Sequence, residues 1–126
     1  MNRRGFTLIE MLIAVIVLAI VGSSIATAIG GVVNQSYAME RRTLAHWIGQ
    51  NEIARLRIDL RAEPRILPEG RDYRRVFMGE REWDVRTSII ATEVPLIRRV
   101  EIDVYELVDG ERTGPYDHLI AFVGRH

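Results

Sequence analysis

Hydrophobic and polar positions divide this chain into two unlike parts. Met11 to Met39 contains no charged residue, and Met11 to Val33 is an almost unbroken apolar run. From Glu40 onward, arginine, glutamate and aspartate are frequent. At about 1.5 Å per residue, a helix over the apolar run is long enough to cross the roughly 30 Å hydrocarbon core of a bilayer. The pattern therefore predicts a membrane-spanning helix followed by a polar domain.

Helical periodicity continues beyond the apolar run. No proline occurs before Pro64, and residues 40–61 are rich in helix formers, so we expect one helix of about fifty residues or more. Its carboxyl-terminal half carries an apolar stripe with a period of 3.6, broad and imperfect because Glu52 falls within it and Trp47 and Ile58 lie beside it. Part of this face should cover a sheet, and another part should meet a partner. The stripe consists of Tyr37, Leu44, Ala45, Ile48, Gly49, Leu56 and Leu60.

After Pro64 and Pro68 the apolar period changes from helical spacing to alternation, which predicts strands. We expect a turn at residues 79–81, and a third strand ended by Asp109-Gly110 together with Gly114-Pro115. Short connections between successive strands favour an antiparallel meander of about four strands. The sequence thus predicts an α+β fold in which the helix packs on the apolar face of the sheet. The expected strands cover residues 74–78, 83–89, 100–105 and 119–123.

Composition narrows the chemistry that this chain can perform. With 126 residues it has room for one small domain besides the apolar segment. Its 17 basic and 17 acidic residues give no bulk argument for binding nucleic acid. The absence of cysteine excludes disulfides, thiolate zinc sites and cysteine nucleophiles. His46, His118 and His126 have no metal-ligand spacing, and we predict no catalytic residues, no cofactor and no metal.

The segment before the apolar run has features that an ordinary secretory signal lacks. Such a signal has a shorter apolar centre and a small-residue cleavage site, for which Ala26-Thr27-Ala28 is a weak match. Glu10 places a carboxylate at the start of the apolar helix, where a charge is costly without a partner. Thr7 and Glu10 also have the spacing of a capping box. Capping and a role in assembly are compatible interpretations of this carboxylate.

Gly5-Phe6-Thr7-Leu8-Ile9-Glu10, after a short basic leader with Arg3 and Arg4, resembles a type IV prepilin signal. The resemblance implies that prepilin peptidase cleaves between Gly5 and Phe6 and methylates the new amino group of Phe6. It also implies that Glu10, with Thr7, acts in assembly, where the carboxylate meets the amine of a filament neighbour. Small residues spaced by four, such as Gly22-Ala26-Gly30, favour helix packing in a bundle.

The stretch from Glu40 to Glu52 resembles the post-membrane helix of the minor pseudopilin I family of the type II secretion system, except that Gly49-Gln50 replaces the usual Ala-Glu. Arg98-Arg99-Val100-Glu101-Ile102 is similar to that family's final strand region. The resemblance implies a pilin-like fold and a non-enzymatic role at the tip of the periplasmic pseudopilus. Implied partners are prepilin peptidase, minor pseudopilins J, K and H, major pseudopilin G and, before assembly, inner-membrane lipid, with no nucleic acid. Leu44, Trp47, Ile48 and Asn51 are the candidate partner interface.

These resemblances imply four segments and a location. Residues 1–5 are the leader, 6–36 the transmembrane or filament-core helix, 37–63 the amphipathic periplasmic part of the helix, and 64–126 the linker and sheet. Arginines flank both ends of the apolar run, so charge does not decide its orientation. The leader is too short to fold, which favours a cytoplasmic leader and a periplasmic domain anchored by a single pass in the inner membrane.

Two other classes of function stay open. A minor pilin of a type IV pilus or competence system that binds DNA would need a basic, aromatic patch, for which Tyr73 with Arg71, Arg74 and Arg75 is the candidate. A membrane-tethered enzyme or binding module would need a pocket with convergent polar groups. A cation site is a further option, but alternating arginines predict cross-strand charge pairs instead. The acidic residues concerned are Glu80, Glu82, Asp84, Glu101 and Asp103, and the arginines are Arg86, Arg98 and Arg99.

Overall fold

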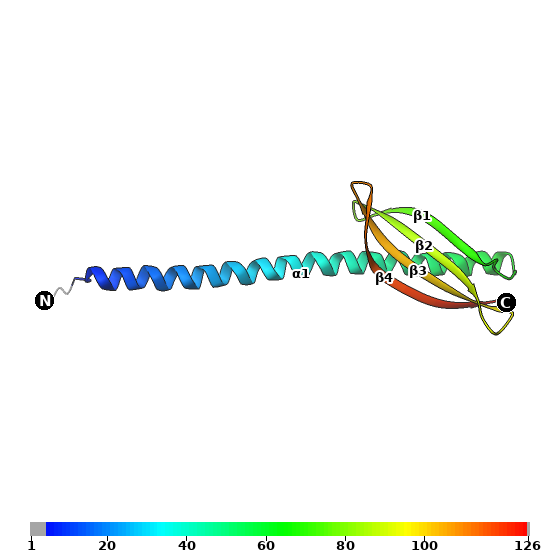
Figure 1. Cartoon of the computed structure of the whole chain (residues 1–126), viewed down its shortest axis with the longest axis horizontal. Coiled ribbons are helices and arrows are strands. Elements are labelled where there is room, and N and C mark those ends of the chain that lie inside the picture. The colour runs from blue at the N-terminus through cyan, green and yellow to red at the C-terminus, as the bar shows by residue number, and fades with distance from the viewer. Residues whose placement is uncertain (1–4, 126) are drawn as a thin grey trace. The chain divides into compact units, whose positions relative to one another are not determined.

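The chain divides into two compact units, residues 1–38 and residues 39–126, and the computed structural model describes residues 5–125. Helix α1, Leu8–Ala62, contains 55 residues, which confirms the predicted long helix. Four antiparallel strands follow it, so the predicted α+β, pilin-like arrangement is also confirmed (Figure 1). The strands are β1 Gly70–Met78, β2 Arg81–Ala91, β3 Ile97–Val108 and β4 Glu111–Gly124.

The strands form a meander in the order β1-β2-β3-β4, with every neighbouring pair antiparallel (Figure 1). Gly79 and Glu80 connect β1 to β2 with φ angles of 62° and 59°, and Asp109 and Gly110 connect β3 to β4 with φ angles of 52° and 82°. Two successive positive φ angles match the right-handed twist of a two-residue hairpin. The turns that the sequence predicts at these positions are confirmed.

Two predicted strand boundaries are wrong. β1 begins at Gly70 rather than at residue 74. β4 begins at Glu111 rather than Leu119, because Gly114-Pro115 lies inside the strand at a register shift opposite Val104 and Glu106 instead of ending the hairpin. An edge strand with a bulge accommodates a proline that cannot donate a ladder hydrogen bond.

The core of residues 39–126 lies between α1 and one face of the sheet. Alternation along β2 and β3 is confirmed, because Trp83, Val85, Val100, Ile102 and Val104 are all less than 2% exposed. The helix contributes buried apolar residues at successive spacings of three, five and seven positions, which keep them on one side of the helix. These helix residues are Ala45, Ile48, Ile53 and Leu60. Tyr37, which the periodicity placed on the same stripe, belongs to the first unit and is 55% exposed.

Gly49 lets the helix approach β4 closely. A Cβ atom at this position would lie 2.3 Å from Cδ1 of Leu119, which is a buried core residue. The space that this glycine leaves is therefore filled by a leucine on the facing strand. We infer that the two positions depend on each other for packing.

Charged side chains also enter the interface between helix and sheet. Glu52 is 5% exposed, and its Oε2 accepts a hydrogen bond of 3.0 Å from Nη1 of Arg74 on β1. The buried carboxylate within the apolar stripe is therefore half of an ion pair. Because a buried charge without a partner is strongly destabilising, Arg74 makes Glu52 tolerable at this position.

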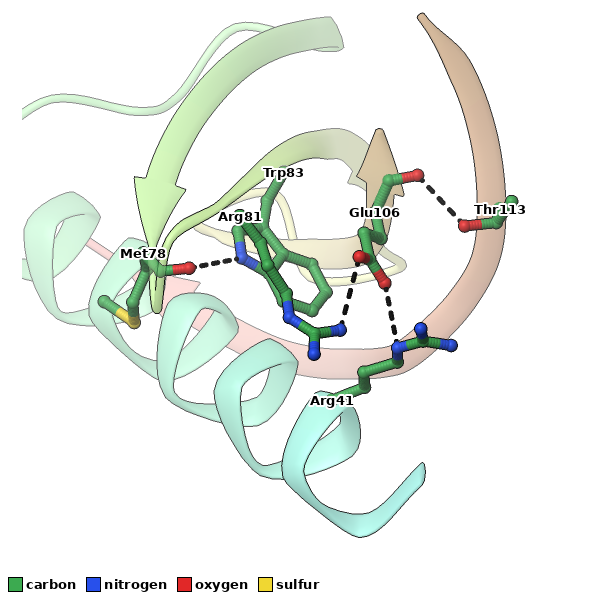
Figure 2. A network of polar contacts seen from close by, with 6 residues as sticks. All are labelled: Arg41, Met78, Arg81, Trp83, Glu106 and Thr113. Carbon is green, nitrogen blue, oxygen red and sulfur yellow. Dashed lines mark hydrogen bonds and ion pairs between the residues drawn. The ribbon is translucent and has the colours of Figure 1, made fainter. Parts of the chain in front are cut away.

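A second buried carboxylate, Glu106, holds together the end of the sheet near residue 41 of α1 (Figure 2). Arg81 on β2 donates a hydrogen bond of 3.3 Å from Nη1 to Oε1 of Glu106. Nε of Arg41 lies 3.3 Å from Oε2, an ion pair whose geometry is not that of a hydrogen bond. The hydroxyl of Thr113 donates to the backbone carbonyl of Glu106 at 3.2 Å. One residue thus connects α1, β2, β3 and β4.

Replacement of Glu106 by glutamine should lower the free energy of unfolding of residues 39–126 by about 1–3 kcal/mol, because two partly buried arginines lose their counter-charge. Urea unfolding of the full chain in detergent, followed by the near-ultraviolet circular dichroism of buried Trp83, measures the change. Glu82→Gln is the matched control, because Glu82 is half exposed and its contact with Arg75 spans 3.6 Å; it should change stability by less than about 0.5 kcal/mol. Equal effects of the two substitutions would contradict the proposed role of the Glu106 network.

Candidate functional site

The residues that precede α1 form a capping box. The backbone N–H of Thr7 donates to Oε2 of Glu10 at 3.1 Å, and the N–H of Glu10 donates to Oγ1 of Thr7 at 3.3 Å. The N–H of Met11 donates to the carbonyl of Thr7 at 3.2 Å, which makes Thr7 the N-cap residue. The capping interpretation of Glu10 is therefore confirmed.

Gly5 and Phe6, the expected cleavage site, precede the first helical residue. Both residues are exposed, Phe6 at 82%, and among the described residues beyond its chain neighbours no atom lies within 4 Å of where a Cβ of Gly5 would be. The peptide bond between them therefore lies outside α1 and is accessible from several sides. Residues 1–4 of the expected leader, including Arg3 and Arg4, lie outside the residues that the structure describes.

The apolar part of α1 has the length and composition of a membrane span. Its most apolar window of 18 residues has a mean hydropathy of 2.6, and none of that window is buried within the chain. The hydroxyls of Ser23, Ser24 and Thr27 donate to carbonyls one turn earlier at 2.8–2.9 Å. Polar groups inside this segment are thus satisfied within the helix, as hydrocarbon surroundings require.

The four residues expected to contact a partner separate into two pairs. Ile48 is 2% exposed and Leu44 packs against the core, so both serve the domain's own interior. Trp47 is 57% exposed and Asn51 is exposed as well. Periodicity alone did not separate these pairs, because the apolar face of this helix is broad.

Trp47 and Asn51 belong to a longer row on the side of α1 that faces away from the sheet. Ala54 and Ile58 continue the row at spacings of three and four residues, and Ile58 is 65% exposed. We call Trp47, Asn51, Ala54 and Ile58 the outer helix stripe. Ala54 was not among the predicted residues, although its spacing from Trp47 was available in the sequence.

The face of the sheet turned away from α1 carries a ladder of stacked cations and aromatic rings. The guanidinium of Arg86 lies 4.9 Å from the ring centre of Tyr73 and 5.5 Å from that of Tyr105. The guanidinium of Arg112 also lies over the ring of Tyr105, 5.6 Å from the ring centre. Such contacts hold arginine side chains against the sheet.

Carboxylates accompany the basic cluster predicted around Tyr73. Arg75 pairs with Glu82 at 3.6 Å, and Arg74 is turned toward Glu52 on α1. The cross-strand pairing predicted for Arg86 and Arg99 is wrong, because each contacts a carboxylate two residues away on its own strand, Asp84 and Glu101 respectively. Side chains two positions apart in a strand lie on the same face, which makes these contacts possible. Arg98 donates instead to the carbonyl of Leu67 at 3.1 Å.

His46 and His118 each contact one carboxylate, and His126 lies outside the residues that the structure describes. Nδ1 of His46 lies 2.8 Å from Oδ2 of Asp117, and Nδ1 of His118 lies 2.5 Å from Oδ1 of Asp103. His118 lies within β4. Within residues 5–125, no group of three or more histidine, cysteine, aspartate or glutamate residues is arranged to hold a metal ion.

Comparison with known proteins adds two family matches. Residues 39–121 match the family model of the type II secretion system, protein I, and residues 1–26 match the prokaryotic N-terminal methylation motif. The first match covers well over half of the chain, and it begins at the boundary of the second compact unit.

Curated relatives agree with the first match. The type II secretion system protein I of Pseudomonas aeruginosa is 29% identical over 128 aligned residues, covering 98% of this chain and 96% of the relative. The Escherichia coli protein of the same name is 26% identical over 102 residues, covering 81% and 80%. The Klebsiella pneumoniae protein is 28% identical over 109 residues, covering 82% of each chain. This chain therefore belongs to the protein I family of the type II secretion system.

Proposed function

We propose that this chain is a minor pseudopilin that is processed by prepilin peptidase and assembled into the tip complex of the periplasmic pseudopilus. In this proposal the apolar part of α1 first anchors the protein in the inner membrane, with residues 39–126 in the periplasm. Pseudopilins J, K and H are its neighbours at the tip, above the major pseudopilin G. The observation that carries the proposal is a capped, lipid-compatible helix joined in one chain to a unit that matches protein I.

Processing is supported by the position of Gly5 and Phe6. A peptidase needs an extended, accessible backbone, and these residues lie exposed ahead of the N-cap Thr7. Cleavage between them would leave both hydrogen bonds of the capping box in place. The mature helix would therefore keep its amino-terminal cap after losing the leader.

In cells that contain prepilin peptidase, we expect the chain to lose residues 1–5 and to carry one methyl group on the amino nitrogen of Phe6. Intact mass measurement of the membrane-extracted protein tests this expectation. Gly5→Val should retain the leader, because a β-branched side chain restricts the approach of the peptidase to the backbone. A wild-type protein that retains residues 1–5 in these cells would contradict the proposed processing.

Glu10 has a second proposed role besides capping. Cleavage creates an amine at Phe6, close to a carboxylate that would lie in hydrocarbon and needs an opposite charge there. The capping box gives Oε2 of Glu10 a backbone N–H but no cation. We propose that the amine of a neighbouring subunit supplies that charge during assembly.

Two substitutions separate capping from charge pairing. Glu10→Gln keeps a side chain that can complete a capping box but removes the negative charge, whereas Thr7→Ala removes the hydroxyl acceptor and leaves the carboxylate. We expect Glu10→Gln to be processed yet recruited into the tip complex at least about tenfold less, and Thr7→Ala to be recruited nearly normally. Affinity isolation of the complex with quantification of each subunit measures recruitment. Equal recruitment of the two variants would rule out charge pairing.

The outer helix stripe is the proposed contact with a neighbouring pseudopilin, which we take to be J. It places a half-exposed indole and a half-exposed isoleucine on one helical side. Helices pack through residues spaced three and four apart, and buried tryptophan often dominates such contacts. Leu44 and Ile48 support the stripe from inside the domain instead of contacting the partner.

Trp47→Ala should weaken binding to pseudopilin J on the order of tenfold to a hundredfold, because an anchoring indole is lost from the contact. Titration of the detergent-solubilised full chain with purified pseudopilin J measures the affinity. Asp59→Ala is the control, since Asp59 is exposed on the same helix and lies neither three nor four residues from any member of the stripe. Unchanged affinity of the Trp47 variant would place the contact on another surface.

A further inference from the structure

The two edges of the sheet differ in their chemistry. β1 forms one edge, and four of its first six residues are charged: Arg71, Asp72, Arg74 and Arg75. Charged side chains on an edge strand discourage pairing with another strand. β4 forms the opposite edge, and its segment from Leu119 to Val123 has no charged residue. The β1 edge therefore has this protection, whereas the part of the β4 edge from Leu119 to Val123 does not.

The backbone of the β4 segment is available for a further strand. Within residues 5–125, β4 pairs with β3 alone, and no other backbone hydrogen bond involves Leu119–Gly124. Every second residue of an edge strand directs its N–H and carbonyl groups outward. Ile120 is 53% exposed and Phe122 is 63% exposed, which adds apolar surface beside this edge.

Two arginines from α1 lie next to the same edge. Arg57 and Arg61, one helical turn apart, line a hollow of about 260 Å³ with Leu60, Phe122, Val123 and Gly124. No ion pair joins either arginine to a carboxylate among the described residues. The hollow therefore combines the ring of Phe122, an exposed strand backbone and two arginines. Within residues 5–125, neither arginine has a carboxylate partner.

We propose that the β4 edge from Leu119 to Gly124 receives an extended, acidic segment of a partner protein, which pairs as an additional strand and places a carboxylate between Arg57 and Arg61. Main-chain hydrogen bonds hold the segment, and the arginines select its charge. A second copy of this chain does not fit the site, because its β1 edge would bring three arginines toward Arg57 and Arg61 and its β4 edge has no acidic residue between Leu119 and Val123. This surface is separate from the outer helix stripe and does not depend on it.

The test uses the full chain in detergent micelles and a synthetic peptide of about ten residues, with alternating valine and threonine and two central aspartates. Hydrogen exchange of the backbone amides reports where the peptide binds, and titration reports how tightly. We expect slower exchange at Leu119–Gly124. A peptide with asparagine in place of aspartate should bind more weakly, and one with N-methylated alternate amides should not bind.

Arg57→Gln and Arg61→Gln should each weaken binding of the aspartate peptide on the order of tenfold. The double variant Arg42→Gln with Arg55→Gln is the control, because it removes two exposed arginines of the same helix outside the hollow. Trp47→Ala should leave peptide binding unchanged, so failure here is distinguishable from failure of the proposed contact with pseudopilin J. Three outcomes would overturn the proposal: equal binding of the N-methylated peptide, equal losses in the control, or concentration-dependent protection of β4 without peptide, which indicates self-pairing.

Discussion

Burial of one side of α1, from Ala45 to Leu60, against the sheet is the interaction on which residues 39–126 depend. The sheet has a single apolar face, and one helix supplies its cover. Fully burying a large aliphatic or aromatic side chain contributes about 1.5–3 kcal/mol. A core this small therefore tolerates few substitutions that change its packing. One of its tightest contacts is that between Gly49 and Leu119.

The same constraint explains why two carboxylates are buried next to that core. Glu52 and Glu106 both lie on surfaces that α1 and the sheet cover, and each has arginine partners from another element. Losing one partner would leave a buried charge, which costs far more than losing an exposed pair. These ion pairs therefore favour one register of helix on sheet over its neighbours, whereas apolar contacts alone are less selective.

Much of this architecture could be predicted because it depends on periods and turns. Apolar alternation predicted the inner faces of β2 and β3. Asp109-Gly110 predicted a hairpin because both residue types tolerate the positive φ angles that they adopt in the structure. Gly114-Pro115 was wrongly predicted to end the hairpin, because the same residues that end a strand also fit a bulge on an edge strand. Glu106 continues the inward alternation after Val104, but no local rule names its distant partner Arg41.

The candidate site was likewise predictable where its contacts are local in sequence, and unpredictable where they depend on the position of the sheet. Thr7 and Glu10 interact within one helical turn, so their spacing sufficed to predict the capping box. Trp47 and Ile48 are adjacent and both apolar, and only the position of the sheet decides which one is buried. The arginine ladder with Tyr73 and Tyr105 likewise needs the register of three strands.

The surfaces that remain uncovered differ in the partner that physical chemistry allows. An apolar helix segment with satisfied hydroxyls suits lipid or other helices, a row spaced three and four apart suits a helix, and an uncharged strand edge suits a strand. Because these partners make different kinds of contact, one does not compete with another for the same atoms. Substitutions on separate surfaces should then have nearly additive effects on assembly. Glu10 differs from the rest, since its carboxylate already serves a structural purpose: only variants that preserve the cap can reveal whether its charge serves a second one.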